Sequence, residues 1–415
     1  MGTKNKKINV GIGFVTGRKN FKDVAKAYVK NWKQDSDEIT KNISINLFVA
    51  YDLSYQKTLV SDYKNLDDEV LDIVDSAYYI GETVIANEAD HLIAKKIVKK
   101  NEVNLIFGSG YAKKRNLILY FAIKNRMDYL IFLDDDEYPM AVMKLDNNMV
   151  WKGQDVLATH IRNLDKADIT HGHHCGYISP LPYVEFNDQL SENEFRIFIE
   201  SISNDIITWD SIKEKMQKGG ITYADMDIIN TEKTKVVKEI DGMKFISGGN
   251  LGFNLKNTDK IFPFYNPPGA RGEDTFLSTS LGKTDVWKVP SYTFHDGFGA
   301  YKSLLEGVLP QNLKSIYHDY GKNTERFLKA AIGWIRYKPL LLYIIRRDSY
   351  EEEINEMREN LTLVLPRIST YFGNNAFNSL LKELEYYHSH VKKHFEEFKK
   401  TGEVWSKMLS YLKTI

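Results

Sequence analysis

The amino-acid sequence predicts an α/β fold, in which a mixed, mostly parallel sheet is flanked by helices and followed by a helical C-terminal region. Over about the first 300 residues, short apolar segments alternate with segments of helical periodicity. This β–α–β order is typical of a largely parallel sheet with helices on both faces. From about residue 305 the pattern is helical, highly charged and poor in glycine. We therefore predict an α/β domain at residues 1–304 and a helical domain at residues 305–415.

The N-terminal part supplies the strands and helices that this order requires. Residues 8–15 are an apolar run, and residues 21–32 place apolar side chains at helical spacing. Residues 43–50 alternate, whereas residues 129–133 are wholly apolar and stop abruptly at acids. We expect strands at residues 8–15, 43–50 and 129–133, and helices at 21–32, over most of 61–98 and at 116–124, with a short strand or break near 78–81.

The second part is mixed before it becomes helical. We expect strands at residues 167–178, 244–255 and 286–294, a helix at 191–217, and amphipathic helices at 351–361, 379–399 and 404–412. In open sheets of this kind, ligands bind beyond the carboxyl ends of the strands. The residues that follow each predicted strand are therefore the first candidates for a functional site.

The charge and cysteine content excludes some classes of protein. The chain has 56 basic and 56 acidic residues and no formal net charge, whereas proteins that bind mainly nucleic-acid phosphates carry a basic excess. Its single cysteine, Cys175, cannot form an intrachain disulfide. No segment approaches the roughly 20 apolar residues that span a bilayer. We expect a cytoplasmic protein that does not bind nucleic acid.

Four consecutive acidic residues, Asp134 to Glu137, follow the predicted strand at residues 129–133. Adjacent carboxylates repel one another by on the order of 1 kcal/mol or more even at an effective dielectric constant of 20, and a divalent cation removes this repulsion. Mg²⁺ and Mn²⁺ prefer oxygen ligands, often one or two carboxylates and the oxygens of a diphosphate. On an extended chain Asp134 and Asp136 point to one side, where both can bind one metal ion, while Asp135 points to the other side. The motif predicts a Mn²⁺ or Mg²⁺ site; the alternative is a solvated acidic turn.

The order of segments around these acids resembles that of the GT-A fold glycosyltransferases, and especially their large family-2-like group. There an Ala-Arg-Asn-like segment precedes a helix and a strand ending in Asp-x-Asp; here Arg115 and Asn116 follow two inserted lysines and precede Asp134 to Asp136. The resemblance implies a metal-dependent transferase that uses a UDP- or GDP-sugar. It makes Asp136 the direct metal ligand and Asp134 a contact to the ribose or sugar of the donor. Arg115, Asn116 and Asp135 join the donor site by the same resemblance.

Two other strand ends resemble the nucleotide-binding parts of that family. The turn Thr16-Gly17-Arg18 follows the first strand, at the place of the nucleotide-contacting turn. Asp52 follows the second strand, at the place of the acid near the base. A carboxylate there accepts a hydrogen bond from the base or from a ribose hydroxyl. The alternative role of Asp52 is a simple turn or helix cap.

The segment Gly248-Gly249-Asn250 is similar to one that lies under the donor sugar and acceptor in GT-A enzymes. Paired glycines let the backbone approach a ligand closely. The alternative is a tight turn or a β-bulge.

The acid pair Glu273-Asp274 opens a predicted helix about twenty residues later. In inverting relatives a carboxylate here is the general base, which must reach the acceptor hydroxyl; of the two we favour Asp274. The alternative is that acids simply favour the first turn of a helix. His295 ends another strand and is placed as a further metal ligand, as in some retaining relatives, or as a structural histidine. The stereochemistry of transfer is therefore left open.

Two remaining features carry less information. The histidines at residues 171–174 do not have the spacing of a structural zinc site, and we expect a strand on the acceptor side instead. Residues 334–347 combine aromatic, aliphatic and basic types, which is typical either of a peripheral membrane contact for a lipid-linked acceptor or of a core helix, and we favour the core helix. The later helices would bind acceptor or form a homo-oligomer.

Three functions compete at this point. Glycosyl transfer to a glycan, protein or lipid-linked acceptor accounts for the order of all the motifs. A sugar-nucleotide pyrophosphorylase would carry a Gly-rich loop with Arg and Pro after the first strand, and residues 16–20 are a poor version of it. A non-enzymatic cation-binding or scaffold protein would bind metal without a diphosphate. We predict the transferase.

Overall fold

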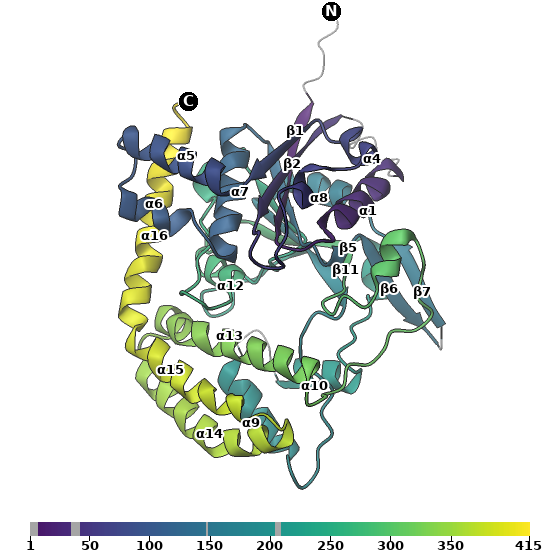
Figure 1. Cartoon of the computed structure of the whole chain (residues 1–415), viewed down its shortest axis with the longest axis vertical. Coiled ribbons are helices and arrows are strands. Elements are labelled where there is room, and N and C mark those ends of the chain that lie inside the picture. The colour runs from purple at the N-terminus through teal and green to yellow at the C-terminus, as the bar shows by residue number, and fades with distance from the viewer. Residues whose placement is uncertain (1–6, 35–41, 147, 204–208) are drawn as a thin grey trace, which may run out of the picture.

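The computed structural model describes residues 7–34, 42–146, 148–203 and 209–415 and shows an α/β protein (Figure 1). A large mixed, mostly parallel sheet is flanked by helices and followed by a helical C-terminal region, which confirms the predicted fold class. The strands are β1 (Ile8–Thr16), β2 (Ile43–Tyr51), β3 (Ser76–Ile80), β4 (Tyr129–Leu133), β5 (Glu137–Tyr138), β6 (Met140–Leu145), β7 (Asn148–Gly153), β8 (Ile169–Gly176), β9 (Lys235–Val236), β10 (Leu251–Asn254) and β11 (Val286–His295).

The order of the main sheet is β3-β2-β1-β4-β10-β8-β11-β5, with β9 paired to β11 and with β6 and β7 in a separate hairpin. β1 to β4 are parallel, β10 runs antiparallel between β4 and β8, and β8 and β11 are parallel again. Because β1, β4, β8 and β11 run in one direction, their carboxyl ends meet at one edge of the sheet. That edge is where an open α/β sheet binds its ligands.

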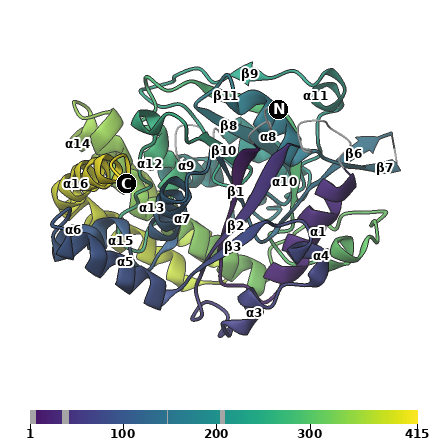
Figure 2. The same ribbon diagram turned by 90° about the horizontal axis from the view of Figure 1, so that it is seen from above.

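Helices cover both faces of the sheet (Figure 2). Val10, Ile12 and Phe14 of β1 share a core with α1 (Phe21–Gln34) and α8 (Val156–Leu164) on one face. On the other face, a Cβ on Gly13 would lie 2.7 Å from Cγ2 of Ile118 in α7 (Tyr111–Lys124). A glycine in this strand therefore lets a helix pack closely. The other helices of this part are α3 (Ser61–Lys64), α4 (Asp68–Leu71), α5 (Glu82–Ala94), α6 (Lys100–Ile106), α9 (Glu192–Ile202), α10 (Trp209–Gln217), α11 (Met226–Thr231), η1 (Thr258–Lys260), α12 (Glu273–Ser278) and η2 (Lys302–Glu306).

The C-terminal helices are α13 (Lys322–Ile345), α14 (Tyr350–Tyr371), η3 (Asn375–Asn378), α15 (Ser379–Ser389) and α16 (Val391–Leu412). α13, α14 and α15 share a buried apolar core with α9 and α10. This core includes Leu340, Leu341 and Leu342 of α13, in agreement with the core-helix interpretation of residues 334–347. α16 returns along one side of the molecule to α6 (Figure 1), and Nε1 of its buried Trp405 donates a 2.9 Å hydrogen bond to the carbonyl of Ile261. The boundary near residue 305 stays a prediction.

Some predicted boundaries differ from the structure. The helix expected at 116–124 begins at Tyr111, directly after Gly110. The strand expected at 244–255 is reduced to β10, because the chain bends at Gly248-Gly249-Asn250 and Asn250 has a φ of 50°. The helix expected at 379–399 is interrupted at His390 and belongs to α15 and α16.

Candidate functional site

The ends of β1, β4 and β11 bring the predicted nucleotide and metal residues together. Thr16 is the last residue of β1, Asp134 directly follows β4, and His295 is the last residue of β11. β1 pairs with β4, and His295 stands opposite Glu137 of β5 in antiparallel register. The acidic motif therefore lies between Thr16 on one side and His295 on the other.

Arg18 binds the two middle acids of the motif. Its Nε lies 3.0 Å from Oδ1 of Asp135, and its Nη2 lies 2.7 Å from Oδ2 of Asp136. Oγ1 of Thr16 donates a 2.6 Å hydrogen bond to the other oxygen of Asp135. Burial raises the pKa of Asp135 to about 7, although Arg18 favours its charged form. Asp135 is thus held by the turn that follows β1.

His295 faces Asp136 from the opposite strand. Its Nε2 lies 3.4 Å from Oδ2 of Asp136, and its Nδ1 contacts the carbonyl oxygen of Tyr177. Burial opposes charge on both side chains, but their mutual attraction outweighs it. The pKa of Asp136 is therefore lowered and that of His295 is raised to about 9. In the protein alone the two form an ion pair.

The donor set at Asp136 and His295 fits a divalent metal ion. With Nδ1 donating to the carbonyl of Tyr177, the neutral imidazole presents the lone pair of Nε2 toward Asp136, which is the usual arrangement of a metal-binding histidine. Metal binding would replace the imidazolium proton. Among the described residues no group of three or more His, Cys, Asp or Glu side chains forms a metal cage. Two side chains would leave most of the coordination positions of such an ion to ligands other than these residues.

Arg115 connects Asp134 to the second acidic group. Its Nη2 lies 3.2 Å from Oδ1 of Asp134, and its Nε lies 3.5 Å from Oε1 of Glu273. The hydroxyl of Tyr111 donates a 2.8 Å hydrogen bond to the same oxygen of Asp134. Arg115 is only 1% exposed, and its guanidinium also lies over the rings of Tyr111 and Phe132. This buried cation thus places two distant parts of the chain side by side.

Glu273 and Asp274 begin α12, directly after Gly272 with a φ of 87°. Burial raises the pKa of Glu273 to about 7, and the neighbouring Asp274 adds to this rise, whereas Arg115 opposes it. Burial also raises the pKa of Asp274. A pKa near neutral pH suits the Glu273 carboxylate to accept and return a proton.

The paired glycines lie against both acidic groups. A Cβ on Gly249 would lie 2.7 Å from Oε1 of Glu137 and 2.9 Å from Oδ2 of Asp134. A Cβ on Gly248 would lie 3.4 Å from Oδ2 of Asp274. Only glycine leaves enough space at residue 249, because real Cβ atoms essentially never approach other heavy atoms within 3.0 Å. The backbone of this segment thus approaches carboxylates of the protein closely, whereas the sequence predicted a close approach to a ligand.

The side chains of two predicted donor-binding residues already have hydrogen-bond partners within the protein. Asn116 is fully buried and exchanges two hydrogen bonds with the backbone of Phe264, at 2.9 and 2.7 Å. Asn250 is also fully buried, and its side chain bonds to Nε2 of His160 and to the carbonyl of Ser291. In this structure the side chains of both asparagines are bonded within the protein core and do not face the site.

Gly17 and Asp52 lie at the turn after β1 and the end of β2. Oδ1 of Asp52 accepts hydrogen bonds from the backbone and hydroxyl of Ser54, as a turn cap does. Its other oxygen lies 3.9 Å from Nζ of Lys114, which donates to the carbonyl of Tyr51. A Cβ on Gly17 would lie 2.6 Å from Cβ of Tyr55, so the two loops touch. Asp52 remains one-third exposed, although Ser54 and Lys114 already contact its two oxygens.

A further buried network was not predicted from the sequence. Glu137 accepts a 2.7 Å hydrogen bond from Oγ1 of Thr293 and lies 3.1 Å from Nδ1 of His174. Nε2 of His174 is 2.6 Å from Oγ of Ser247, just before the paired glycines. His174 lowers the pKa of the buried Glu137 carboxyl against the effect of burial. The available signal was the position of Glu137 directly after Asp136.

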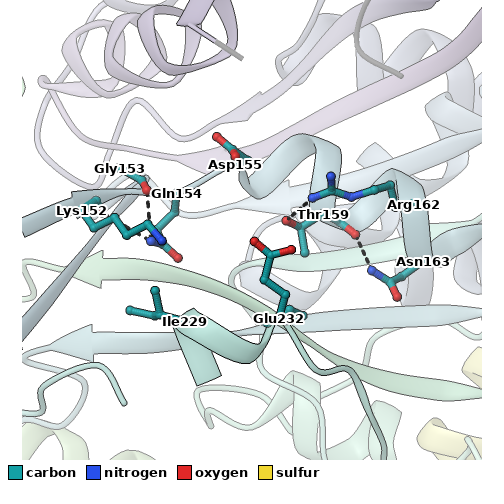
Figure 3. A pocket seen from close by; sticks show the side chains of 10 residues that line it. Lys152, Gly153, Gln154, Asp155, Thr159, Arg162, Asn163, Ile229 and Glu232 are labelled. Carbon is teal, nitrogen blue, oxygen red and sulfur yellow. Dashed lines mark hydrogen bonds between the residues drawn. The ribbon is translucent and has the colours of Figure 1, made fainter. Parts of the chain in front are cut away.

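A small pocket of about 100 Å³ lies elsewhere, between β7, α8 and α11 (Figure 3). Lys152, Asp155, Arg162 and Glu232 are among the side chains that line it. None of the predicted site residues lines this pocket, so we keep the strand ends as the candidate site.

The sequence matches no protein-family model, and no curated protein sequence matches it significantly. Within the described residues, no helix has the length and apolar content needed to cross a membrane.

Proposed function

We propose that this chain is a divalent-metal-dependent glycosyltransferase that moves a sugar from a nucleotide-diphosphate sugar to an acceptor hydroxyl. The observation that carries the proposal is the position of Arg115, which lies between Asp134 at the end of β4 and Glu273 at the start of α12. A donor bound at the first acidic group would lie next to a carboxylate able to accept a proton. The order of these segments resembles GT-A fold enzymes.

The residues of the second acidic group would activate the acceptor. Asp274 or Glu273 accepts the proton of the acceptor hydroxyl while its oxygen forms a bond to the anomeric carbon and the bond to the diphosphate breaks. The raised pKa of both carboxyls supports this role, and Glu273, whose pKa is raised to about 7, can both accept and release a proton near neutral pH. Arg115 limits the rise in the pKa of Glu273 and thereby favours the charged form of this carboxyl group.

The first acidic group would bind the donor. Asp136 and His295 would hold Mn²⁺ or Mg²⁺, which as a Lewis acid stabilises the negative charge of the leaving diphosphate. Asp134 would accept a hydrogen bond from the sugar or ribose, and Asp52 one from the base. The acceptor is a glycan, a protein or a lipid-linked molecule, and we place the reaction in the cytoplasm because the buried Cys175 has no cysteine partner in the sequence.

Calorimetric titration with UDP, GDP, CDP and ADP, each with Mn²⁺ and with EDTA, tests the proposal. We expect one nucleoside diphosphate to bind with Mn²⁺ and at least tenfold more weakly with EDTA, because the ion links Asp136 to the diphosphate. Binding of Mn²⁺ with no affinity for any of the four would overturn the transferase and support a cation-binding scaffold.

A further inference from the structure

α13 crosses the edge of the sheet that carries the candidate site, and Figure 1 shows it passing below α12 and β11. Glycines in α13 and in the segments that pack against it show where α13 approaches the site closely. A Cβ on Gly297, just after β11, would lie 3.0 Å from Nη2 of Arg326, and a Cβ on Gly272 would lie 3.0 Å from the ring of Tyr337. These two positions on α13 are about 16 Å apart along the helix axis. The helix therefore extends from the His295 end of the site to the start of α12.

Arg326 lies beside the proposed metal ligands. The Cβ added on Gly297 would also lie 2.8 Å from Cε1 of His295, so the imidazole of His295 and the guanidinium of Arg326 are neighbours. The guanidinium also lies 4.3 Å from the centre of the Phe298 ring, which fixes its position. Asp136, whose charge acts on Arg326, is already bonded to Arg18.

Arg271 reaches the same region from the loop before α12. A Cβ on Gly333 would lie 2.9 Å from Cδ of Arg271, and Gly333 is on the same face of α13 as Arg326, two turns further on. The absence of side chain at residue 333 thus makes room for the stem of Arg271. Two arginines therefore border one stretch of α13: Arg326 beside His295, and Arg271 two residues before Glu273 in the chain.

Neither arginine has an ion-pair partner within the described parts of the chain, in contrast to Arg18 and Arg115 in the same site. Arg326 is partly buried, and its burial lowers the pKa of its guanidinium although Asp136 opposes this effect. A partly buried guanidinium without a bonded carboxylate is costly unless an anion approaches it. Pairs of guanidinium groups match the geometry of phosphate oxygens.

We propose that Arg326 and Arg271 bind a phosphate group beside Asp136 and His295. This inference rests on the proposed function, because either the diphosphate of the donor or a phosphate on the acceptor would carry that group to the site. α13 then has a role in ligand binding in addition to its role in the helical core.

Titration of the Arg326→Gln/Arg271→Gln double variant with inorganic pyrophosphate in EDTA tests the inference. We expect its affinity to be at least about tenfold lower than that of the wild type, because two charge-assisted hydrogen bonds are lost. Lys329→Gln removes an exposed charge one turn further along α13 and should change the affinity less than about twofold. Arg326→Lys keeps a charge and should bind better than Arg326→Gln. Circular dichroism verifies that each variant is folded.

A second titration, with the nucleoside diphosphate that binds the wild type in Mn²⁺, separates the two sources of phosphate. A parallel loss of affinity in the double variant assigns the arginines to the diphosphate of the donor, and an unchanged affinity assigns them to a phosphate of the acceptor. Pyrophosphate affinity equal to that of the wild type overturns the arginine site and leaves the transferase intact. A wild type that binds pyrophosphate but no nucleoside diphosphate keeps the arginine site and overturns the transferase; binding of neither overturns both.

Discussion

Nη2 of Arg18 lies 2.7 Å from Oδ2 of Asp136, the carboxylate that we propose as a metal ligand. The same oxygen faces Nε2 of His295 at 3.4 Å. In the protein alone, therefore, the cationic partners of Asp136 are supplied by the chain, and an added metal ion has to compete with them. This competition separates binding of the ion by itself from binding of the ion together with a diphosphate.

Replacement of Arg18 by Gln should raise the affinity for Mn²⁺ in the absence of nucleotide. Two unit charges at this distance interact by a few kcal/mol at an effective dielectric constant of 20, and loss of even about 1 kcal/mol of this competition corresponds to about fivefold in affinity. Calorimetric titration with MnCl₂ measures the change. Lys19→Gln, at the exposed neighbouring position, is the control for a general loss of charge. Equal or weaker Mn²⁺ binding in Arg18→Gln would contradict the competition.

Replacement of Asp136 by Ala or Asn should abolish Mn²⁺-dependent binding of a nucleoside diphosphate while the protein stays folded. The carboxylate lies 3.4 Å from Nε2 of His295, and an amide is a weaker ligand for a hard cation than a carboxylate. The affinity measured with Mn²⁺ should fall to the value measured with EDTA. Asp72→Asn, at an exposed position outside the site, should leave the difference unchanged. Retention of metal-dependent binding in the Asp136 variants would remove this residue from the metal site.

The short apolar segments between helical segments of the sequence were sufficient to predict the strands at the centre of the sheet. Residues 8–15 and 129–133 read as apolar runs because both faces of β1 and β4 are buried under helices, and the structure places strands there. The pattern could not reveal the antiparallel β10 between β4 and β8, since strand direction depends on the connections between strands and not on the side chains of the strand. The bend at Asn250 was predicted only as an alternative to the close approach to a ligand, because a left-handed φ at asparagine costs little and leaves no apolar signal.

The candidate site was predicted in part. The acids after β4 and at the start of α12 were identified from their order, but their joint contact with Arg115 needed the three-dimensional structure, since more than 130 residues separate them. The inward orientation of Asn116 was also beyond the sequence, because a polar residue in the first turns of a helix is usually exposed. Arg326 was missed because it belongs to a segment with a helical pattern and no motif.

Replacement of Gly249 by Ala should weaken binding of the donor nucleotide and lower stability by about 1–3 kcal/mol. The added Cβ would lie within 3.0 Å of carboxylate oxygens of the buried Glu137 and the half-buried Asp134, and hydrogen bonds to Thr293 and Tyr111 restrict the movement of these two side chains. Urea denaturation measures the stability and calorimetry the affinity. Gly402→Ala is the matched control, because no heavy atom lies within 4 Å of its Cβ position in α16 and alanine favours a helix. A Gly249 variant as stable as this control would show that the acids relax at no cost.

Replacement of Glu273 by Gln should stabilise the protein more at pH 8 than at pH 5, with EDTA present. Burial and Asp274 raise the folded pKa of Glu273 from its ordinary value of 4.5 to about 7. The favourable contribution of its neutral form is therefore complete below about pH 4.5 and is lost as the pH rises through 7, because the charge must then be held inside the protein. The difference between the ordinary and the folded pKa of Glu273 corresponds to about 3 kcal/mol at most. The attraction between Arg115 and the carboxylate is already included in the folded pKa. Glutamine mimics the neutral form at every pH, so the melting temperature of the variant should exceed that of the wild type at pH 8 and approach it at pH 5. An equal difference at both pH values would show that Glu273 keeps an ordinary pKa and would argue against it as the proton acceptor.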